Sequence, residues 1–558
     1  MWGDVKMTER DRVGLRLAAV AAALAMLAAS CGGSSGNKAT GSSTTTGGPT
    51  GPSGAQGTPK SGGRLVMGVE AEVDGFDPTS NRWDVTGLTY SKTVYDPLAV
   101  YGKDNQVHPY LAQSIDHNAD YTAWTIKLRP NITFSNGDPL TSDAVVADLQ
   151  ALQKAALTGP ALTNIASVTK VDDLTAQVNC KTPWVPFPVY LTGQVGVVFN
   201  PKMLTDPERS RHPIGTGPFI LKEWVPGNHF IATKNLNYWQ KGLPYLDTIE
   251  YRPIIESQSR ESSLLSGTID IMHSSDAQTI VDLKGNSKVG SFTDANVAGE
   301  SEEHFIMLNT GKAPLDDPEL RQALAYATDR KKEVNVIYFG IPPDSNGPFG
   351  NTGSPYHGDT GYPSFDLNKA KALVKDYEQK HNVTSVSFEL GLTNSGRNLQ
   401  DMSLIQDMWK QAGINVTLKQ VEQSQFILNA LVGSYQAYDW RQFGEPDPDA
   451  DFVWWSAATA SPQGQLALNF SRNKDPMVDA GLLKGRTSSN PADRVAAYQD
   501  IAKRFAATTP FIWLSETVWQ IAYKPNVHGM ETWTLPDGTP GVDHTLGGEF
   551  LLSHVWVG

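Results

Sequence analysis

One cysteine near the start of the chain stands where its thiol could be made to carry a lipid. Residues 1–16 include three arginines, Leu17–Ala29 is apolar throughout, and Cys31 follows two residues later. A basic start, a short apolar middle and small residues before a cysteine indicate an export signal. Crossing a hydrocarbon core takes about 20 apolar residues, so this run is too short for a membrane-spanning helix.

The residues around this cysteine support that chemistry. The segment Leu27–Cys31 resembles the bacterial lipobox. In the lipobox the cysteine is thioether-linked to diacylglycerol, the chain is cleaved just before it, and its new amino group is acylated. It departs from the commonest pattern, because Ala28 stands where leucine is usual. We expect residues 1–31 to be a lipoprotein signal that leaves Cys31 lipidated. The alternative is a plain secretory signal with a chance cysteine.

The next segment has the composition of a tether. Residues 32–60 are almost wholly Gly, Ser, Thr, Pro, Ala and Asn, with no apolar periodicity. Such a segment cannot bury enough surface to offset its ordering entropy, so we expect a disordered linker. A flexible coil of this length reaches roughly 30 Å. It would hold a folded body close to a membrane surface.

Residues that could perform catalysis or bind metal give no matching pattern. The chain has no His-Glu-x-x-His, no Gly-x4-Gly-Lys and no convincing nucleophile motif, and its histidines are scattered. Asp447–Asp451 is spaced like a calcium loop, but Phe452 replaces the required glycine and Ala458 the required glutamate. We interpret it as a solvated acidic loop. We therefore expect no catalytic residues, no cofactor and no metal site.

Composition sets limits on the partners. About 500 residues follow the linker, enough for two or three domains with their own cores. The net charge of −13 disfavours nucleic acid or an anionic lipid surface as the main partner. Cys180 lies in an alternating apolar stretch, which indicates a buried strand residue. There is thus no disulfide framework.

Tryptophan is abundant, with 14 in the chain. We expect most to pack in cores, whereas some could line a ligand cleft, where aromatic rings supply large contact areas. The second half holds Trp440, Trp454, Trp455, Trp513 and Trp519.

Periodicity then predicts the elements that must position these residues. Residues 65–69 read as a buried strand, residues 124–128 alternate as a half-buried strand, and a helix should begin near Ser142. Asp317 should cap a helix that begins with Pro318, and Asp366 should cap another.

The second half continues in the same way. A helix through residues 399–409 should stop at Gly413, directly before a strand at 414–418. Another helix from Pro491 precedes a strand at 511–514. A repeated helix followed at once by a strand is typical of an α/β lobe.

At this point the chain resembles the family 5 extracellular solute-binding proteins of ABC importers, the dipeptide, oligopeptide and nickel type. The resemblance covers nearly everything from Gly62 to Gly558 and rests on the order and spacing of several blocks. These are Gly62–Leu65, Gly75–Pro78, Tyr95–Leu98, Val107–Ala112, Leu128–Gly137, Ser142–Val145, Ile214–Phe219, Asn237–Trp239, Leu265–Asp270, Leu308–Asn309 and Leu315–Asp329.

The resemblance implies an α/β, two-lobed periplasmic-binding-protein fold of type II, with a hinge between the lobes. Lobe 1 would span residues 61–305 and include an extra domain at about 96–212. Lobe 2 would span 306–512, and 513–558 would return to lobe 1. The family implies crossings near 305–309 and near 512–516. Ligand contacts made only in the closed form would shift the population toward closure.

The same resemblance gives candidate residues for the ligand. Peptide-binding relatives use an aspartate for the α-ammonium, and the matching stretch is Tyr438–Asp449. The acidic position falls near Phe443 or Gly444, neither of which is acidic. Asp439, Glu445 or Asp447 could substitute for it, beside Trp440 and Arg441.

Two further places are implied. Arg397, in the loop from Thr393, is a candidate partner for a carboxylate, and the alternative is a solvated loop arginine. Glu72, Val73 and Asp74 would end the first strand, where family members face the cleft. For Asp74 the alternative is a turn-capping role.

The resemblance implies a monomeric, lipid-anchored receptor on the extracytoplasmic side that delivers dipeptides or oligopeptides to an ABC permease and its ATPase. Three alternatives stay open: the same role for an oligosaccharide or a metal chelate, an extracytoplasmic ligand sensor, and, least favoured, a lipoprotein hydrolase. An oligosaccharide could stack on Trp454 and Trp455.

Overall fold

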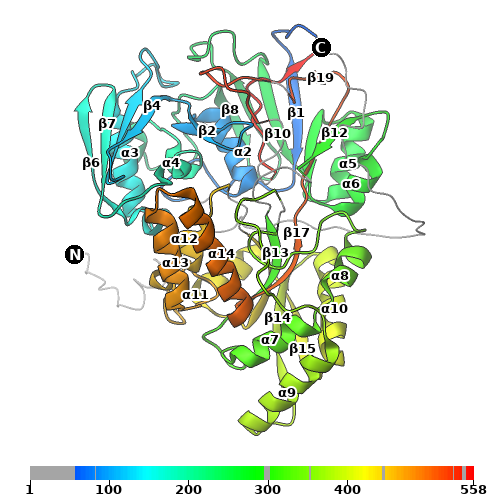
Figure 1. Cartoon of the computed structure of the whole chain (residues 1–558). Helices are drawn as coiled ribbons and strands as arrows, with labels where there is room; N and C mark the ends of the chain where they lie inside the picture. The colour runs from blue at the N-terminus through cyan, green and yellow to red at the C-terminus, as the bar shows by residue number, and fades with distance from the viewer. Residues whose placement is uncertain are drawn as a thin grey trace, which may run out of the picture.

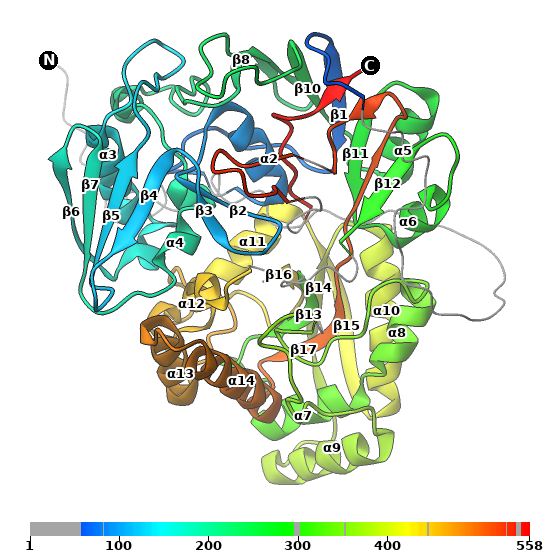
Figure 2. The same cartoon turned by 45° about the horizontal axis from the view of Figure 1, so that its top comes forward.

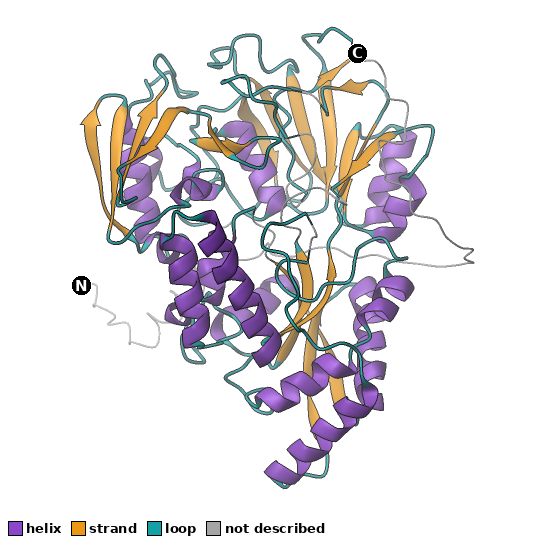
Figure 3. Cartoon of the chain, in the orientation of Figure 1, coloured by secondary structure: helices purple, strands orange, loops and turns teal. Residues whose placement is uncertain are grey.

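The computed structural model describes residues 57–81, 83–294, 302–350, 353–442, 446–531, 533–542 and 548–558. Two α/β lobes lie one above the other, and a small β-rich domain sits beside the upper one (Figures 1 and 3). The predicted signal, linker and lipidation site at Cys31 lie outside the described residues. No helix among the described residues has the length and apolar content needed to cross a bilayer.

The first lobe is built on a seven-stranded sheet of order β12-β18-β11-β1-β10-β9-β8. Its central strand β1 pairs in parallel with β10 and β11, whereas the outer strands pair antiparallel. The strands are β1 (Arg64–Val69), β8 (Phe219–Val225), β9 (His229–Lys234), β10 (Thr248–Pro253), β11 (Ile271–Ser274), β12 (Gly290–Thr293) and β18 (Gln520–Tyr523). Helices α2 (Val85–Val94), α5 (Ser257–Ser266) and α6 (Ala277–Leu283) pack on it, and β19 (Val527–His528) pairs with β20 (Trp556–Val557).

The extra domain has its own core. A four-stranded antiparallel sheet of order β4-β5-β7-β6 packs on α3, and Trp124, Ile126 and Leu149 are buried between them. The four strands are β4 (Ala112–His117), β5 (Ala123–Leu128), β6 (Ile165–Asp172) and β7 (Thr175–Cys180). The domain also contains a two-stranded sheet of β2 (Ala99–Tyr101) and β3 (Val107–Pro109). Its helices are α3 (Ser142–Lys154), η1 (Gly159–Leu162), α4 (Phe187–Tyr190), η2 (Gln194–Gly196) and η3 (Pro201–Thr205). Cys180 ends β7 and is buried, as predicted.

The second lobe carries a five-stranded sheet of order β15-β14-β16-β13-β17, with helices on both sides (Figure 2). The strands are β13 (Glu303–Leu308), β14 (Val386–Thr393), β15 (Ile414–Val421), β16 (Ala437–Gln442) and β17 (Phe511–Glu516). The helices are α7 (Pro318–Ala327), α8 (Arg330–Ile337), α9 (Leu367–His381), α10 (Gly396–Gln411), α11 (Gln423–Val432), η4 (Pro448–Asp451), α12 (Phe452–Trp455), η5 (Ala457–Thr459), α13 (Pro476–Thr487) and α14 (Pro491–Thr508).

The predicted helix starts are confirmed. The Asp317 carboxylate accepts hydrogen bonds from the backbone N–H groups of Glu319 and Leu320, and Asp366 caps α9 in the same way. Pro318 at the first position of α7 has the backbone φ a helix needs and lacks an N–H that would have no partner there. A large core lies between the sheet and these helices, and it contains Trp440, Trp454, Trp455 and Trp513.

The chain passes between the two large sheets twice. It leaves the first sheet after β12 and enters the second at β13, and it returns between β17 and β18. β13 and β17 are antiparallel neighbours, so both passages lie at the same end of the second sheet. We propose that the lobes meet along these two passages and that the predicted division into lobes follows them.

Candidate functional site

A hollow lies between the two lobes, next to the passages. Its floor is formed by β13, β16 and the first turn of α10 in the second lobe. Its opposite wall is the turn from Ser275 to Ala277 at the start of α6, together with Thr517 and Val518. Its cavity volume in this arrangement is about 50 Å³, well below the roughly 300–1,000 Å³ of small-ligand sites, so a ligand needs the lobes to separate further.

Four of the predicted residues line this hollow: Asp439, Trp440, Arg441 and Arg397. The first three are consecutive in β16, where each of them pairs with a residue of β13. Arg397 comes from the neighbouring helix. The structure therefore brings together residues that are about 40 positions apart in the chain.

Arg441 reaches across the hollow. Its Nη1 donates a hydrogen bond of 2.9 Å to Ser275 Oγ in the first lobe, and its Nε lies 3.2 Å from Glu302 Oε2. The guanidinium also lies over the ring of Trp519, 5.4 Å from its centre. A side chain of the second lobe thus contacts the first lobe directly.

Glu70 is the acidic group that faces Arg441 from the first lobe. Its carboxylate lies 3.9 Å from Arg441 and 3.7 Å from Arg260, and the side chains of Glu70 and Arg260 are both buried. Burial raises the pKa of Glu70 to about 7, against the opposing attraction of the two arginines. This residue was not predicted, although it directly follows the predicted first strand.

Asp439 is buried and already has a partner. Its Oδ1 lies 2.8 Å from Nε2 of His304, on the adjacent strand β13. Burial disfavours the charged imidazole, but the hydrogen bond and charge of Asp439 outweigh it and raise the pKa of His304. His304 also lines the hollow and was not among the predicted residues.

Arg397 is not a solvated loop arginine, so that alternative is wrong. Ser395 caps α10, and Arg397 lies in its first turn with only 6% of its surface exposed. Its guanidinium lies over the ring of Tyr338, 4.7 Å from the centre, and donates to the carbonyl oxygen of Ile337. Arg397 is therefore a buried residue that lines the hollow.

The remaining predicted residues lie elsewhere. β1 ends at Val69, and Glu72 accepts hydrogen bonds from Trp224 Nε1 and from the N–H of Gly227 in the hairpin from β8 to β9. Val73 is buried in the core of the first lobe.

Asp74 is half-buried and does not line the hollow. Burial raises the pKa of its carboxyl to about 7. Phe443 and Glu445 lie outside the described residues.

The acidic segment is not solvated, which corrects the prediction. Asp447 accepts two hydrogen bonds of 2.7 Å from Arg494, and Asp449 and Asp451 are buried. Asp449 accepts from Arg486 at 2.9 Å and from Trp184 Nε1 of the extra domain at 2.8 Å. The segment folds inward because buried arginines supply the partners that water would otherwise provide.

Comparison with known proteins agrees with this architecture. The profile of the bacterial extracellular solute-binding proteins, family 5, matches residues 106–475. The chain belongs to this family. It is 26% identical over 471 residues to a glutathione-binding protein, GsiB, of Pectobacterium atrosepticum, covering 81% of this chain and 88% of that protein. It is also 26% identical over 455 residues to the nickel-binding periplasmic protein of Escherichia coli, covering 78% and 86%.

Solved structures show the same fold. The oligopeptide-binding protein AppA of Bacillus subtilis, solved with a nonapeptide, superposes with a TM-score of 0.77 at 22% identity, covering 90% of this chain and all of that one. The predicted two-lobed fold is confirmed. Family 5 proteins are extracytoplasmic solute-binding components of ABC importers rather than enzymes.

Proposed function

We propose that this protein is a lipid-anchored receptor that captures short peptides in the hollow between its lobes and delivers them to an ABC permease. The observation that carries the proposal is the convergence of both charge signs on one interlobe hollow, which Asp439, Arg397 and Arg441 all line. A peptide carries the complementary pair, an ammonium and a carboxylate.

The charges have partners that a ligand could replace. Arg441 pairs with Glu302, and Asp439 pairs with His304. A peptide carboxylate would exchange with Glu302, and an ammonium would join Asp439. Charge-assisted hydrogen bonds of this kind are strong in a site that excludes water. The glutathione-binding relative supports the proposal, because glutathione carries one ammonium and two carboxylates.

Peptide capture predicts a thermal shift that depends on the peptide's ends. We expect free tripeptides, tetrapeptides or glutathione to stabilise the purified protein by about 2.7 kcal/mol at 100 times the dissociation constant. Arg441→Gln should weaken a free peptide about tenfold and leave its C-terminal amide unchanged, since the guanidinium contacts only the carboxylate. Asp439→Asn should instead remove the preference for a free over an acetylated amino end.

The control for this experiment is Glu389→Gln, which changes an exposed carboxylate on β14, away from the hollow. Stabilisation by oligosaccharides or by a metal chelate, with none by peptides, would overturn the peptide proposal and leave the family assignment intact. Equal effects of Arg441→Gln on the free and the amidated peptide would remove Arg441 from the carboxylate contact.

The anchor has a separate test. Cys31→Ser should move the protein from the membrane fraction to the soluble extracytoplasmic fraction, because the only residue able to carry the diacylglycerol thioether at the signal would be gone. Cys180→Ser is the matched control, since Cys180 is buried in β7 and should leave fractionation unchanged. A Cys31→Ser protein that stays with the membrane would refute the lipid anchor.

A further inference from the structure

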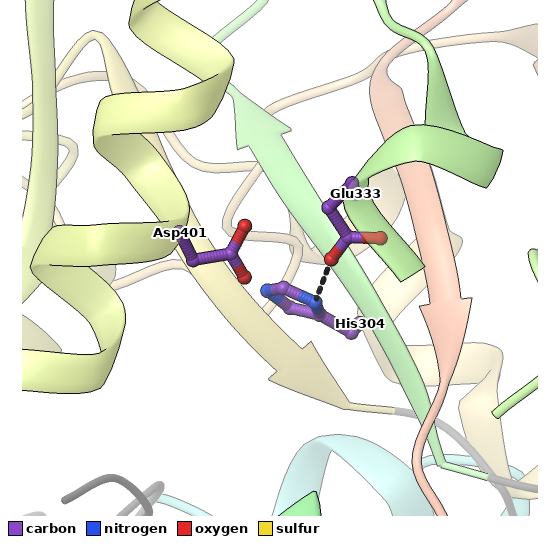
Figure 4. Close-up of side chains that lie close together, drawn as sticks. All are labelled: His304, Glu333 and Asp401. Atoms are coloured by element: carbon purple, nitrogen blue, oxygen red, sulfur yellow. Dashed lines mark ion pairs between the residues drawn. The ribbon is translucent and has the colours of Figure 1, made fainter. Parts of the chain in front are cut away.

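Four buried side chains meet in the second lobe, on the inner side of the hollow's floor. His304 comes from β13, Glu333 from α8, Asp401 from α10 and Asp439 from β16, and Figure 4 shows the first three pointing toward one another. A ring nitrogen of His304 and one carboxylate oxygen each of Glu333 and Asp401 lie within 4.8 Å of one another. Nitrogen and carboxylate ligands at such separations are typical of metal centres.

Glu333 is the most informative member. Its side chain is fully buried, and neither carboxylate oxygen has a hydrogen-bond partner among the described residues. The Nδ1 atom of His304 lies 3.7 Å from its Oε1. Burying a carboxylate without hydrogen bonds costs free energy. The Glu333 side chain therefore lacks a partner that would offset this cost, and a bound cation would be such a partner.

Asp401 is satisfied on one side only. Its Oδ2 accepts a hydrogen bond of 2.9 Å from the hydroxyl of Tyr338, and Oδ1 has no hydrogen-bond partner among the described residues. Burial raises the pKa of Asp401 and, more strongly, that of Glu333, which its neighbouring carboxylates raise further.

The orientation of His304 matches that of a metal ligand. Its Nε2 is held by Asp439 at 2.8 Å, and its Nδ1 lies 3.7 Å from Glu333 Oε1 and 3.5 Å from the hydroxyl of Tyr338. In metal sites the second ring nitrogen is almost always bound to a carboxylate or carbonyl in this way, which fixes the tautomer.

The net charge of the acidic side chains in this cluster also favours a bound cation. When ionised, Glu333, Asp401 and Asp439 carry three negative charges, and Arg397 acts on both Glu333 and Asp401, with the imidazole of His304 acting on Asp401 as well. Two other arginines near the cluster pair with acids of their own, Arg441 with Glu302 and Arg330 with Asp344. With the imidazole neutral and the three carboxylates ionised, a bound divalent ion would balance the two negative charges that remain once Arg397 is counted.

We propose that Nδ1 of His304 and the carboxylates of Glu333 and Asp401 bind a divalent first-row transition-metal ion, with Asp439 as the positioning residue for the imidazole. Metal–ligand bonds of about 2.0–2.2 Å allow ligand atoms to lie up to about 4.4 Å apart. Small side-chain rotations therefore complete the site. Zn²⁺ and Mn²⁺ fit the mixed nitrogen and oxygen ligands best.

All of these groups belong to the second lobe, so the ion would be a resident of that lobe and its binding does not depend on peptide capture. Its effect would reach the hollow, because His304 and Asp439 line it. An ion on Nδ1 would hold the His304–Asp439 pair in place and so fix one wall of the ligand site.

The test uses the whole protein, purified without a histidine tag and stripped with a chelator. Titration with ZnCl₂ and MnCl₂ by calorimetry, and with CoCl₂ by visible absorption, should show one equivalent bound per chain and a rise in melting temperature. Glu333→Gln and Asp401→Asn should each weaken binding by at least about tenfold. Asp376→Asn, which removes an exposed carboxylate from α9 of the same lobe, should bind as the parent does.

A folding control keeps the result interpretable. In chelator, Glu333→Gln should melt no lower than the stripped parent, because it removes a buried charge that has no hydrogen bond. Equal metal affinity in the parent and in Glu333→Gln would overturn the proposal. It would also be overturned if none of the three metals bound at one equivalent per chain. Peptide binding that fails while metal binding persists would count against the proposed function alone.

Discussion

Asp148 shows at the scale of one residue how much an incompletely paired buried group can matter. It lies in α3 of the extra domain with 2% of its surface exposed, and its Oδ2 accepts a hydrogen bond of 3.0 Å from the N–H of Phe199. Its Oδ1 has no hydrogen-bond partner among the described residues. Burial raises the pKa of Asp148 well above 3.8, with the backbone hydrogen bond opposing it.

This shift gives a pH-dependent stability. A raised folded-state pKa favours the protonated form, so the contribution of Asp148 to stability is present below about pH 4 and is lost as the pH rises through the folded-state value. Asp148→Asn should therefore raise the free energy of unfolding at pH 8 by about 1–3 kcal/mol and change it little at pH 4. Thermal or urea unfolding at the two pH values measures this.

Asp120→Asn serves as a control of opposite sign. Hydrogen bonds from Thr122 lower the pKa of that exposed carboxylate, so its loss should destabilise the protein at pH 8 and not at low pH. A benefit of Asp148→Asn that is equal at both pH values would contradict the assignment.

The candidate site was predictable where it is local in sequence. Asp439, Trp440 and Arg441 lie in one strand, so placing that strand at the cleft placed all three. Glu70 was missed by two residues, because the resemblance placed the cleft-facing residues at Glu72–Asp74, whereas β1 ends at Val69, directly before Glu70. The cluster of His304, Glu333 and Asp401 could not be read from spacing, since its members come from three elements that only the tertiary fold brings together.

At the scale of elements, the sequence was most informative where a helix start has a chemical marker. Asp317 and Asp366 cap α7 and α9 as predicted, because a short acceptor side chain before an apolar stripe satisfies the first free N–H groups. The strand at 414–418 and the helix from Pro491 are also confirmed, as β15 and α14.

Elements without such markers, or with distant partners, were not predictable. Asp447–Asp451 looked like a solvated loop because its partners Arg486 and Arg494 lie about 40 residues away, and the structure folds it into η4. The position of β18 between β11 and β12 is another example, since more than 220 residues separate it from both neighbours.

At the scale of the whole molecule, the extra domain touches the second lobe through a buried contact. Trp184 Nε1 donates to Asp449, and Tyr190 accepts from Arg486 Nη2 while donating to the Asp449 carbonyl oxygen. The Arg486 guanidinium lies over the Trp184 ring, 4.8 Å from its centre. This contact should favour the closed arrangement.

Trp184→Phe tests it. The substitution keeps an aromatic ring under Arg486 and removes one hydrogen bond to a carboxylate, worth about 1.5–3 kcal/mol. We expect a larger radius of gyration by small-angle scattering without ligand and a ligand affinity lower by about tenfold or more. Trp224→Phe loses a tryptophan hydrogen bond to Glu72 within the first lobe and should leave both quantities unchanged. An unaltered radius of gyration in Trp184→Phe would show that the contact does not control closure.

The return of the chain to the first sheet has a consequence for biosynthesis. β12 is joined to the rest of its sheet only through β18, which lies near the end of the chain. As the polypeptide emerges from a ribosome or a translocation channel, the second lobe can fold from one uninterrupted segment, since all five strands of its sheet lie between the start of β13 and the end of β17. The sheet of the first lobe is complete only once β18 has been made. The lobe that is begun first is therefore completed after the lobe that is begun second.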